Sequence, residues 1–209
     1  MYYVDDDTEI VFISVEYRLA PEHPAPAALH DSCAGVVWAA ENAARLGIDP
    51  SKIILNGGSV VRLSPWAQRC YDRDCTTSSK EFARDEPWCG TTNRMAWDLV
   101  LGPKRGGGDV SELVAPSRAT DLRALPPTLI DAGACEVFRD EAIALASVMW
   151  KCGVSAELHV RPGAYHGFDM LSQDAPVAQA SVQTKKSWLG RILAAREREL
   201  AAMSVKTVS

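Results

Sequence analysis

The sequence predicts an α/β domain in which helices flank a mostly parallel sheet, and two observations support this class. Short, almost continuous apolar runs at residues 10–15, 53–56 and 128–133 are typical of strands that are covered on both faces of a parallel sheet. Longer segments with the composition or periodicity of helices follow these runs, as in repeated strand–helix units. The chain has 209 residues, of which 47% are hydrophobic, so it can bury the core of one domain spanning residues 1–209.

Composition and charge exclude several classes of partner. The net charge is −5 and the charged residues are interspersed, so the chain lacks the clustered Lys and Arg that bind nucleic acid or an anionic membrane. We therefore expect a small uncharged partner and no nucleic acid. The sequence shows neither a secretory leader pattern nor an apolar run long enough for a transmembrane segment, which predicts a cytoplasmic protein. Nothing in the sequence indicates an oligomeric state.

The six cysteines form no metal-binding or redox pattern. No CxxC pair is present, and the two nearest in sequence, Cys70 and Cys75, have no histidine partner at zinc-finger spacing. We interpret all six as free thiols that pack as small apolar side chains. The sequence thus predicts neither a metal site nor a bound cofactor.

The first predicted strand is followed by a loop and a helix. Three prolines within residues 19–26 fix the loop, because proline restricts both its own φ and the residue before it. The Ala-rich residues 27–46 predict one helix, which Gly47 ends. A turn at residues 48–52 then leads into the second predicted strand.

The second strand ends at Gly57-Gly58-Ser59, which matches the first half of a G-x-S-x-G turn. Such a strand-to-helix turn presents a serine hydroxyl at the top of a sheet, so Ser59 is the candidate nucleophile. The residues that follow depart from the motif. Val61 places a β-branched side chain where the tight turn favours a small residue, and Pro65 interrupts a helix in its second turn. We therefore expect a distorted nucleophile turn.

The middle of the chain carries polar loops around one short helix. Residues 69–82 are interpreted as a polar loop, and the apolar positions between 95 and 101 predict a helix that stops at Gly102-Pro103. The Gly-rich residues 104–109 lack the preceding strand and the following Lys-Ser/Thr of a phosphate-binding loop. We interpret them as a flexible connection.

Two acidic residues follow the third predicted strand. Active sites of open α/β sheets lie outside the carboxyl ends of the strands, so Glu136 is well located for function. Asp140 is the alternative acid. We favour it as a cap or first-turn acid of the predicted helix 141–151, where a negative charge meets the positive end of the helix.

The last part of the chain contributes the candidate base. Residues 156–161 alternate apolar and polar side chains, which predicts a strand near the sheet edge with His159 on its polar face. A turn at residues 162–165 then leads to His166, whose small neighbours leave room for an imidazole to reach over the strand ends. An amphipathic helix at residues 177–200 should pack back on the sheet.

Three segments resemble the hormone-sensitive-lipase-like esterases, the α/β-hydrolase fold-3 group. Residues 15–31 resemble their YRLAPEHPFPAALDD signature, residues 109–119 resemble segments of the form DVSPYAAPARA, and residues 163–168 resemble their catalytic histidine loop. The resemblance implies an incomplete α/β-hydrolase fold and a serine hydrolase acting on small-molecule carboxylic esters. It implies these site residues: Ser59 as nucleophile, His166 as general base, and Glu136 as the acid that orients His166.

The chain also departs from this family. The His-Gly-Gly-Gly loop that supplies most of the oxyanion hole is absent, and the interval between Ser59 and Glu136 is short by one helix and one strand. The expectation is therefore a domain truncated at its N-terminus and internally shortened. A non-catalytic relative that binds a small apolar ligand is the alternative, since the same family includes a plant hormone receptor. His23 and His30 fall in the resembling signature, away from the chemistry.

Overall fold

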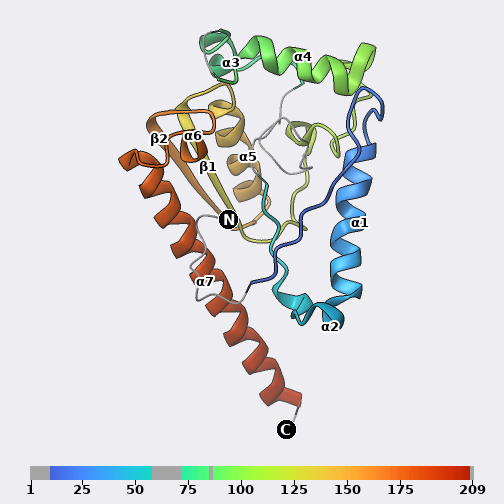
Figure 1. Ribbon diagram of the computed structural model, residues 1–209, viewed down its shortest axis with the longest axis vertical. Coiled ribbons are helices and arrows are strands. Elements are labelled where there is room, and N and C mark those ends of the chain that lie inside the picture. The colour runs from blue at the N-terminus through green and yellow to red at the C-terminus, as the bar shows by residue number, and fades with distance from the viewer. Residues whose placement is uncertain (1–9, 58–71, 85–86, 208–209) are drawn as a thin grey trace.

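The structure of the protein is a computed structural model that describes residues 10–57, 72–84 and 87–207. Its centre is a parallel two-stranded sheet of β1 (Thr128–Cys135) and β2 (Ala156–Tyr165), joined by helix α5 (Arg139–Lys151). Figure 1 shows this strand–helix–strand unit in yellow and orange. These elements confirm the strands predicted near residues 128–133 and 156–161 and the helix predicted at 141–151.

The main core lies between this sheet and α5. The buried side chains of Ala142, Ala146 and Met149 on one face of α5 pack against Ile130 and Ala132 of β1. Ala146 and Met149 are completely buried. An apolar helix face packed on an apolar sheet face is the arrangement that hydrophobic burial favours in α/β proteins.

The strands predicted at residues 10–15 and 53–56 do not form, which corrects the expectation of a larger sheet. In the described part of the chain both segments are irregular and belong to no ladder. Their apolar side chains are exposed: Phe12 by 54% and Leu55 by 55%. A β-branched apolar run favours a strand, but a strand also needs a neighbouring edge for its backbone hydrogen bonds, and neither segment has one here.

The helix predicted at residues 27–46 is divided into α1 (Ala27–Glu41) and α2 (Ala43–Leu46). At the break, the Trp38 carbonyl oxygen accepts from the Asn42 side-chain amide at 2.8 Å and from the Asn42 backbone N–H at 3.0 Å. Gly47 has a φ of 68° and ends α2 as expected. A short 3-10 turn, η1 (Pro50–Lys52), follows.

The proline-rich loop before α1 is tied to that helix by an ion pair. Asp31 accepts hydrogen bonds from the Arg18 side chain and from its backbone N–H, with 2.8 Å between Arg18 Nη2 and Asp31 Oδ1. The hydrogen bond from the Arg18 side chain is the main cause that lowers the pKa of Asp31 to about 2. These signature residues therefore have a structural role here.

Two helices occupy the middle of the chain. Helix α3 (Thr77–Glu81) lies within the segment interpreted as a polar loop, and the Thr76 hydroxyl caps it by accepting from the Ser79 N–H at 3.0 Å. Helix α4 (Gly90–Leu101) starts earlier than predicted and stops at Gly102 as expected. Two 3-10 turns follow, η2 (Gly102–Lys104) and η3 (Pro116–Arg118).

The Gly-rich connection at residues 104–109 is anchored, which corrects its interpretation as flexible. The buried Asp72 carboxylate accepts from the Gly106 N–H at 2.8 Å and from Arg118 Nη2 at 2.7 Å. Arg105 pairs with Asp74 and donates from Nε to the Asp72 carbonyl oxygen at 3.0 Å. These bonds are not evident from the sequence, because Asp72 and Asp74 lie 31 or more residues before these partners.

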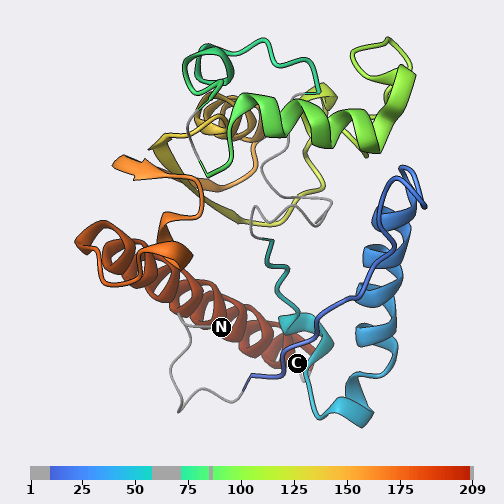
Figure 2. The same ribbon diagram turned by 45° about the horizontal axis from the view of Figure 1, so that its top comes forward.

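The chain ends with α6 (Phe168–Leu171) and the long helix α7 (Pro176–Thr207). The first turns of α7 pack on the sheet as expected: Ala178 and Ser181 are completely buried, and the Ser181 hydroxyl donates to Asp131 Oδ2 of β1 at 2.6 Å. Helix α7 lies on the side of the sheet opposite α5, and its second half extends away from the sheet (Figure 1, Figure 2). No helix in the described ranges is long and apolar enough to cross a membrane.

Candidate active site

The strand topology brings two of the predicted site residues together. Glu136 directly follows β1 and His166 directly follows β2. The two strands are parallel neighbours, so their carboxyl ends meet at one edge of the sheet, where α/β proteins bind ligands. Helix α5 supplies the crossover that makes this juxtaposition possible.

Glu136 and His166 form a buried hydrogen-bonded pair. The Nδ1 atom of His166 is hydrogen-bonded to Oε2 of Glu136, and the two residues are only 7% and 2% exposed. An ionised carboxylate can only accept, so His166 donates through Nδ1 and, when neutral, keeps a lone pair on Nε2. The other carboxylate oxygen, Oε1, accepts from the Gly133 N–H at 2.6 Å.

Aromatic side chains enclose the imidazole of His166. The Phe138 ring meets it edge to face with 5.0 Å between ring centroids, and the Trp88 ring lies at 6.3 Å. Trp88 and Phe138 belong to a small apolar cluster with Val137, in which Val137 and Phe138 are completely buried. The pair thus lies in apolar surroundings, where hydrogen bonds are electrostatically stronger than in water.

The loop that carries Glu136 is fastened to α3. The Ser78 N–H donates to Asp140 Oδ2 and its hydroxyl donates to the Val137 carbonyl oxygen, both at 2.8 Å. Arg139 donates from Nη1 to the Ala134 carbonyl oxygen at 3.2 Å. These bonds hold residues 134–140 at both ends, so the position of Glu136 depends on a segment that lies far away in the sequence.

Asp140, the alternative acid, has other partners. It lies in the first turn of α5, as expected, and accepts from Ser78 and from Arg139 Nε at 2.9 Å. Burial opposes its ionisation, but the hydrogen bonds from the Arg139 side chain and the Ser78 backbone outweigh that effect and lower the pKa of Asp140. The histidine partner in this structure is therefore Glu136.

The other predicted candidates lie elsewhere. Ser59 falls within residues 58–71, outside the described residues, so its position relative to His166 remains a prediction. His23 and His30 are exposed, and the half-buried His159 lies 3.0 Å from Glu157 through its Nε2 atom. Within the described ranges no three His, Cys, Asp or Glu side chains cluster closely enough to hold a metal ion.

The five described cysteines are free thiols, as predicted. Their expected burial is wrong for Cys33 and Cys75, which are exposed, while the other three are half-buried. Cys33 lies on an outward side of α1, and a thiol is small enough to be tolerated there.

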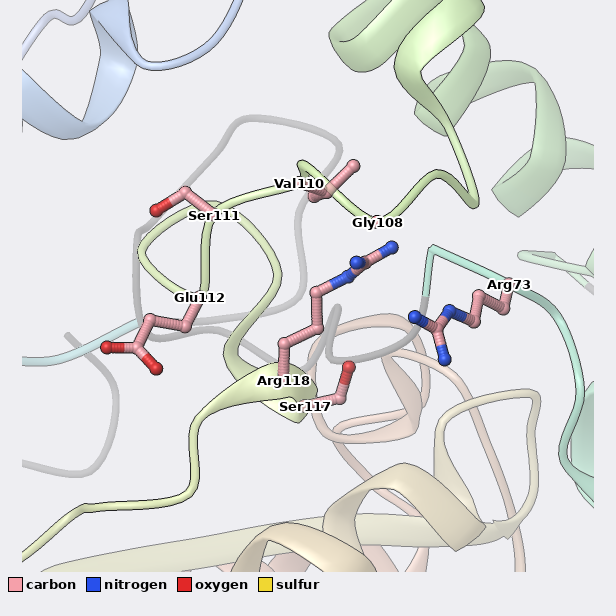
Figure 3. Close-up of a pocket in the computed structure, with 7 residues that line it drawn as sticks. All are labelled: Arg73, Gly108, Val110, Ser111, Glu112, Ser117 and Arg118. Atoms are coloured by element: carbon pink, nitrogen blue, oxygen red, sulfur yellow. The ribbon is translucent and has the colours of Figure 1, made fainter.

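A cavity of about 580 Å³ lies beside the Gly-rich connection (Figure 3). Arg73, Glu112 and Arg118 contribute charged side chains to its wall, and Ser111 and Ser117 contribute hydroxyl groups. The Arg118 guanidinium is already paired with Asp72. Neither residue of the buried pair is among the described residues that line this cavity.

Sequence reasoning missed two residues that hold the pair. Gly133 binds the second oxygen of Glu136, and Ser78 fastens the loop that follows. Small residues at the end of β1, Ala132-Gly133-Ala134, were a signal that another backbone approaches closely there. Nothing in the local sequence around Ser78 indicates its partner 62 positions later.

The fold and the site define an α/β protein with a buried carboxylate–histidine pair at the carboxyl ends of neighbouring parallel strands. The chain belongs to the alpha/beta hydrolase fold family, which it matches over residues 4–60 and 59–170. This membership confirms the resemblance seen in the sequence and accounts for the strand–helix–strand unit that carries Glu136 and His166.

Curated relatives and solved structures agree with this assignment. The chain is 32% identical over 218 residues to the carboxylesterase NlhH of Mycobacterium tuberculosis, covering 93% of this chain and 65% of NlhH. It is 53% identical over 201 residues to lipase 2 of Moraxella sp. (strain TA144), covering 75% of this chain and 46% of that lipase. A solved bacterial heroin esterase superposes with a TM-score of 0.76 at 32% identity, covering 84% of this chain and 62% of that one. The chain thus spans about half to two thirds of the length of these relatives.

Proposed function

We propose that this chain carries the catalytic part of a serine hydrolase that acts on small-molecule carboxylic esters. The observation that carries the proposal is the buried hydrogen bond between Glu136 and His166 at the carboxyl ends of β1 and β2. Ser59 is the proposed nucleophile. The names of the similar proteins, which include a carboxylesterase and a heroin esterase, support an ester as the substrate.

In the proposed reaction, His166 is the general base. Its lone pair on Nε2 accepts the proton of the Ser59 hydroxyl as Oγ attacks the ester carbonyl carbon. The tetrahedral intermediate then collapses, the alcohol leaves with the proton that His166 returns, and an acyl-serine remains. Water, activated by the same imidazole, hydrolyses the acyl-serine and frees the acid. The reaction therefore consists of proton and acyl transfers among the ester, Ser59, His166 and water.

Glu136 has a positioning and electrostatic role in this scheme. Its hydrogen bond to Nδ1 selects the tautomer that leaves Nε2 unprotonated, and its charge stabilises the imidazolium formed during attack. The pair is almost completely buried, so water competes little for either partner. A non-catalytic binding protein, the alternative function, has no need of a buried pair with this geometry, which favours the enzyme.

Ester hydrolysis by purified protein tests the proposal. p-Nitrophenyl acetate is a suitable substrate because its acyl group is small, and the Ser59→Ala variant is the matched comparison. We expect Ser59→Ala to lower kcat by roughly 10³-fold or more, since loss of the nucleophile removes the acyl-enzyme route. Equal rates for the two proteins would overturn the proposal.

A further inference from the structure

We infer that Gly133 is a positioning residue for the Glu136–His166 pair, acting through its N–H group and through its lack of a side chain. The inference rests on the proposed function for its catalytic meaning. Two independent observations support the geometry: a hydrogen bond from Gly133 to Glu136, and the close approach of β2 to Gly133.

The first observation is the hydrogen bond from the Gly133 N–H to Glu136 Oε1. The distance between the Gly133 nitrogen and Oε1 is 2.6 Å. The other oxygen, Oε2, bonds to His166. Each carboxylate oxygen therefore has its own donor, so the carboxylate cannot rotate without breaking one of the two bonds.

The second observation is the close approach of β2 to the Cα of Gly133. A Cβ atom added at Gly133 would lie 2.8 Å from the Ala164 carbonyl carbon, closer still to its oxygen, and 3.3 Å from the Tyr165 carbonyl carbon. All three are backbone atoms and cannot swing aside as a side chain can. Any residue other than glycine would therefore push the ends of β1 and β2 apart.

The strand register explains why the two backbones meet here. Gly133 pairs with Arg161, whereas Cys135 pairs with Tyr165, so β2 contains two more residues than β1 over this interval. Gly163, with a φ of 71°, lies within this bulge. The bulge turns the Ala164 carbonyl onto Gly133, and His166 follows two residues later. Bulges commonly redirect a side chain beside an active site, and here the redirected residue is the candidate base.

Substitution of Gly133 should therefore misplace both partners at once. Glu136 lies three residues after Gly133, and His166 lies two residues after Ala164. A displacement of about 1 Å at a catalytic group commonly costs about 10²-fold in rate. We expect Gly133→Ala to lower kcat on p-nitrophenyl acetate by about 10²-fold while KM changes by less than about threefold, because Glu136 and His166 act on the proton transfers of the chemical step.

Proton NMR supplies a readout that a purely structural role would not change. A buried Nδ1 proton shared with a carboxylate gives a resonance far downfield of the amide region. We expect this resonance in the wild-type protein and at a changed chemical shift, or not at all, in Gly133→Ala. Gly190→Ala should keep the wild-type chemical shift, because its added Cβ meets nothing within 4 Å. Met149→Ala serves as the stability control: Met149 is a fully buried core residue, and the folded fraction of this variant should keep the resonance. An unshifted resonance and wild-type kcat in Gly133→Ala would overturn the inference.

A second measurement decides the case if Gly133→Ala does not fold. The Gly133 amide should exchange slowly with solvent in the wild type and in Glu136→Gln, whose side-chain oxygen can still accept, and much faster in Glu136→Ala. Equal exchange in the two Glu136 variants would refute the hydrogen-bond role. If the wild-type protein hydrolyses no ester, the proposed function fails, while both NMR readouts still test the positioning geometry.

Discussion

His166 and Glu136 are 30 residues apart in the chain, yet Nδ1 of one is hydrogen-bonded to Oε2 of the other in a buried environment. The contact depends on two parallel strands whose carboxyl ends meet and on the helix that joins them. The same relationship gives the imidazole its tautomer and holds it against Phe138.

Glu136→Gln should lower kcat for ester hydrolysis by about 10³- to 10⁴-fold. A glutamine side chain can donate to Nδ1, which favours the wrong tautomer and protonates Nε2. Steady-state kinetics measures the effect, and Glu157→Gln is the control. Glu157 is a half-buried carboxylate on β2 that is remote from the pair. A Glu136→Gln enzyme with the activity of that control would show that Glu136 does not orient the base.

Asp72→Asn should destabilise the fold by about 3 kcal/mol at neutral pH, because it leaves the largely buried Arg118 guanidinium without its ionic partner. Burial opposes ionisation of Asp72, but the hydrogen bonds from Arg118 and Gly106 outweigh it and lower its pKa below 3.8. A group whose pKa is lower in the folded state stabilises the fold above its unfolded pKa. That stabilisation should be lost as the pH falls below about 4.

Chemical denaturation at several pH values measures this effect. The wild-type free energy of unfolding should decrease below pH 4 more steeply than that of Asp72→Asn. Asp121→Asn is the control, because the Asp121–Arg123 pair is exposed and screened by solvent and should contribute little. If the free energies of unfolding of the wild type and Asp72→Asn changed in parallel with pH, the ionised Asp72 carboxylate would not stabilise the Gly-rich connection.

Met149→Ala should lower the free energy of unfolding by about 2–5 kcal/mol, since it opens a cavity in the core between α5 and the sheet. Ile143→Ala on the same helix is the matched comparison, because Ile143 is 40% exposed and leaves no enclosed cavity. Urea denaturation of the two variants gives the difference. Equal losses would mean that α5 does not pack on the sheet through the Met149 face.

The sequence predicts the meeting of Glu136 and His166 because the order of the strands determines it. Glu136 and His166 each follow a strand with a recognisable pattern, and neighbouring parallel strands bring such positions together. The small residues around Gly133 indicate that another backbone approaches closely, but the sequence of β1 does not reveal that this backbone is Ala164, because the contact depends on a bulge in β2. Asp140 could be assigned to the first turn of α5 because the rule for acids at helix starts is local.

The two predicted strands that do not form lack a partner strand among the described residues. The apolar runs that contain Phe12 and Leu55 have strand composition, but a strand forms only where another strand offers hydrogen-bonding partners. The single helix predicted at residues 27–46 divides at Asn42, whose side-chain amide and backbone N–H both bind the Trp38 carbonyl oxygen. A local sequence pattern indicates which secondary structure a segment favours. Whether a strand forms also depends on contacts with segments that are distant in the chain.

The most direct test of the central claim is covalent labelling by a fluorophosphonate, which reacts with an activated serine. Peptide mass spectrometry should locate one adduct on Ser59 in the wild-type protein, and His166→Ala should slow its formation by about 10²-fold or more because the general base is lost. An adduct at another residue, or equal labelling rates for the wild type and His166→Ala, would contradict the assignment of Ser59, His166 and Glu136 as one catalytic unit.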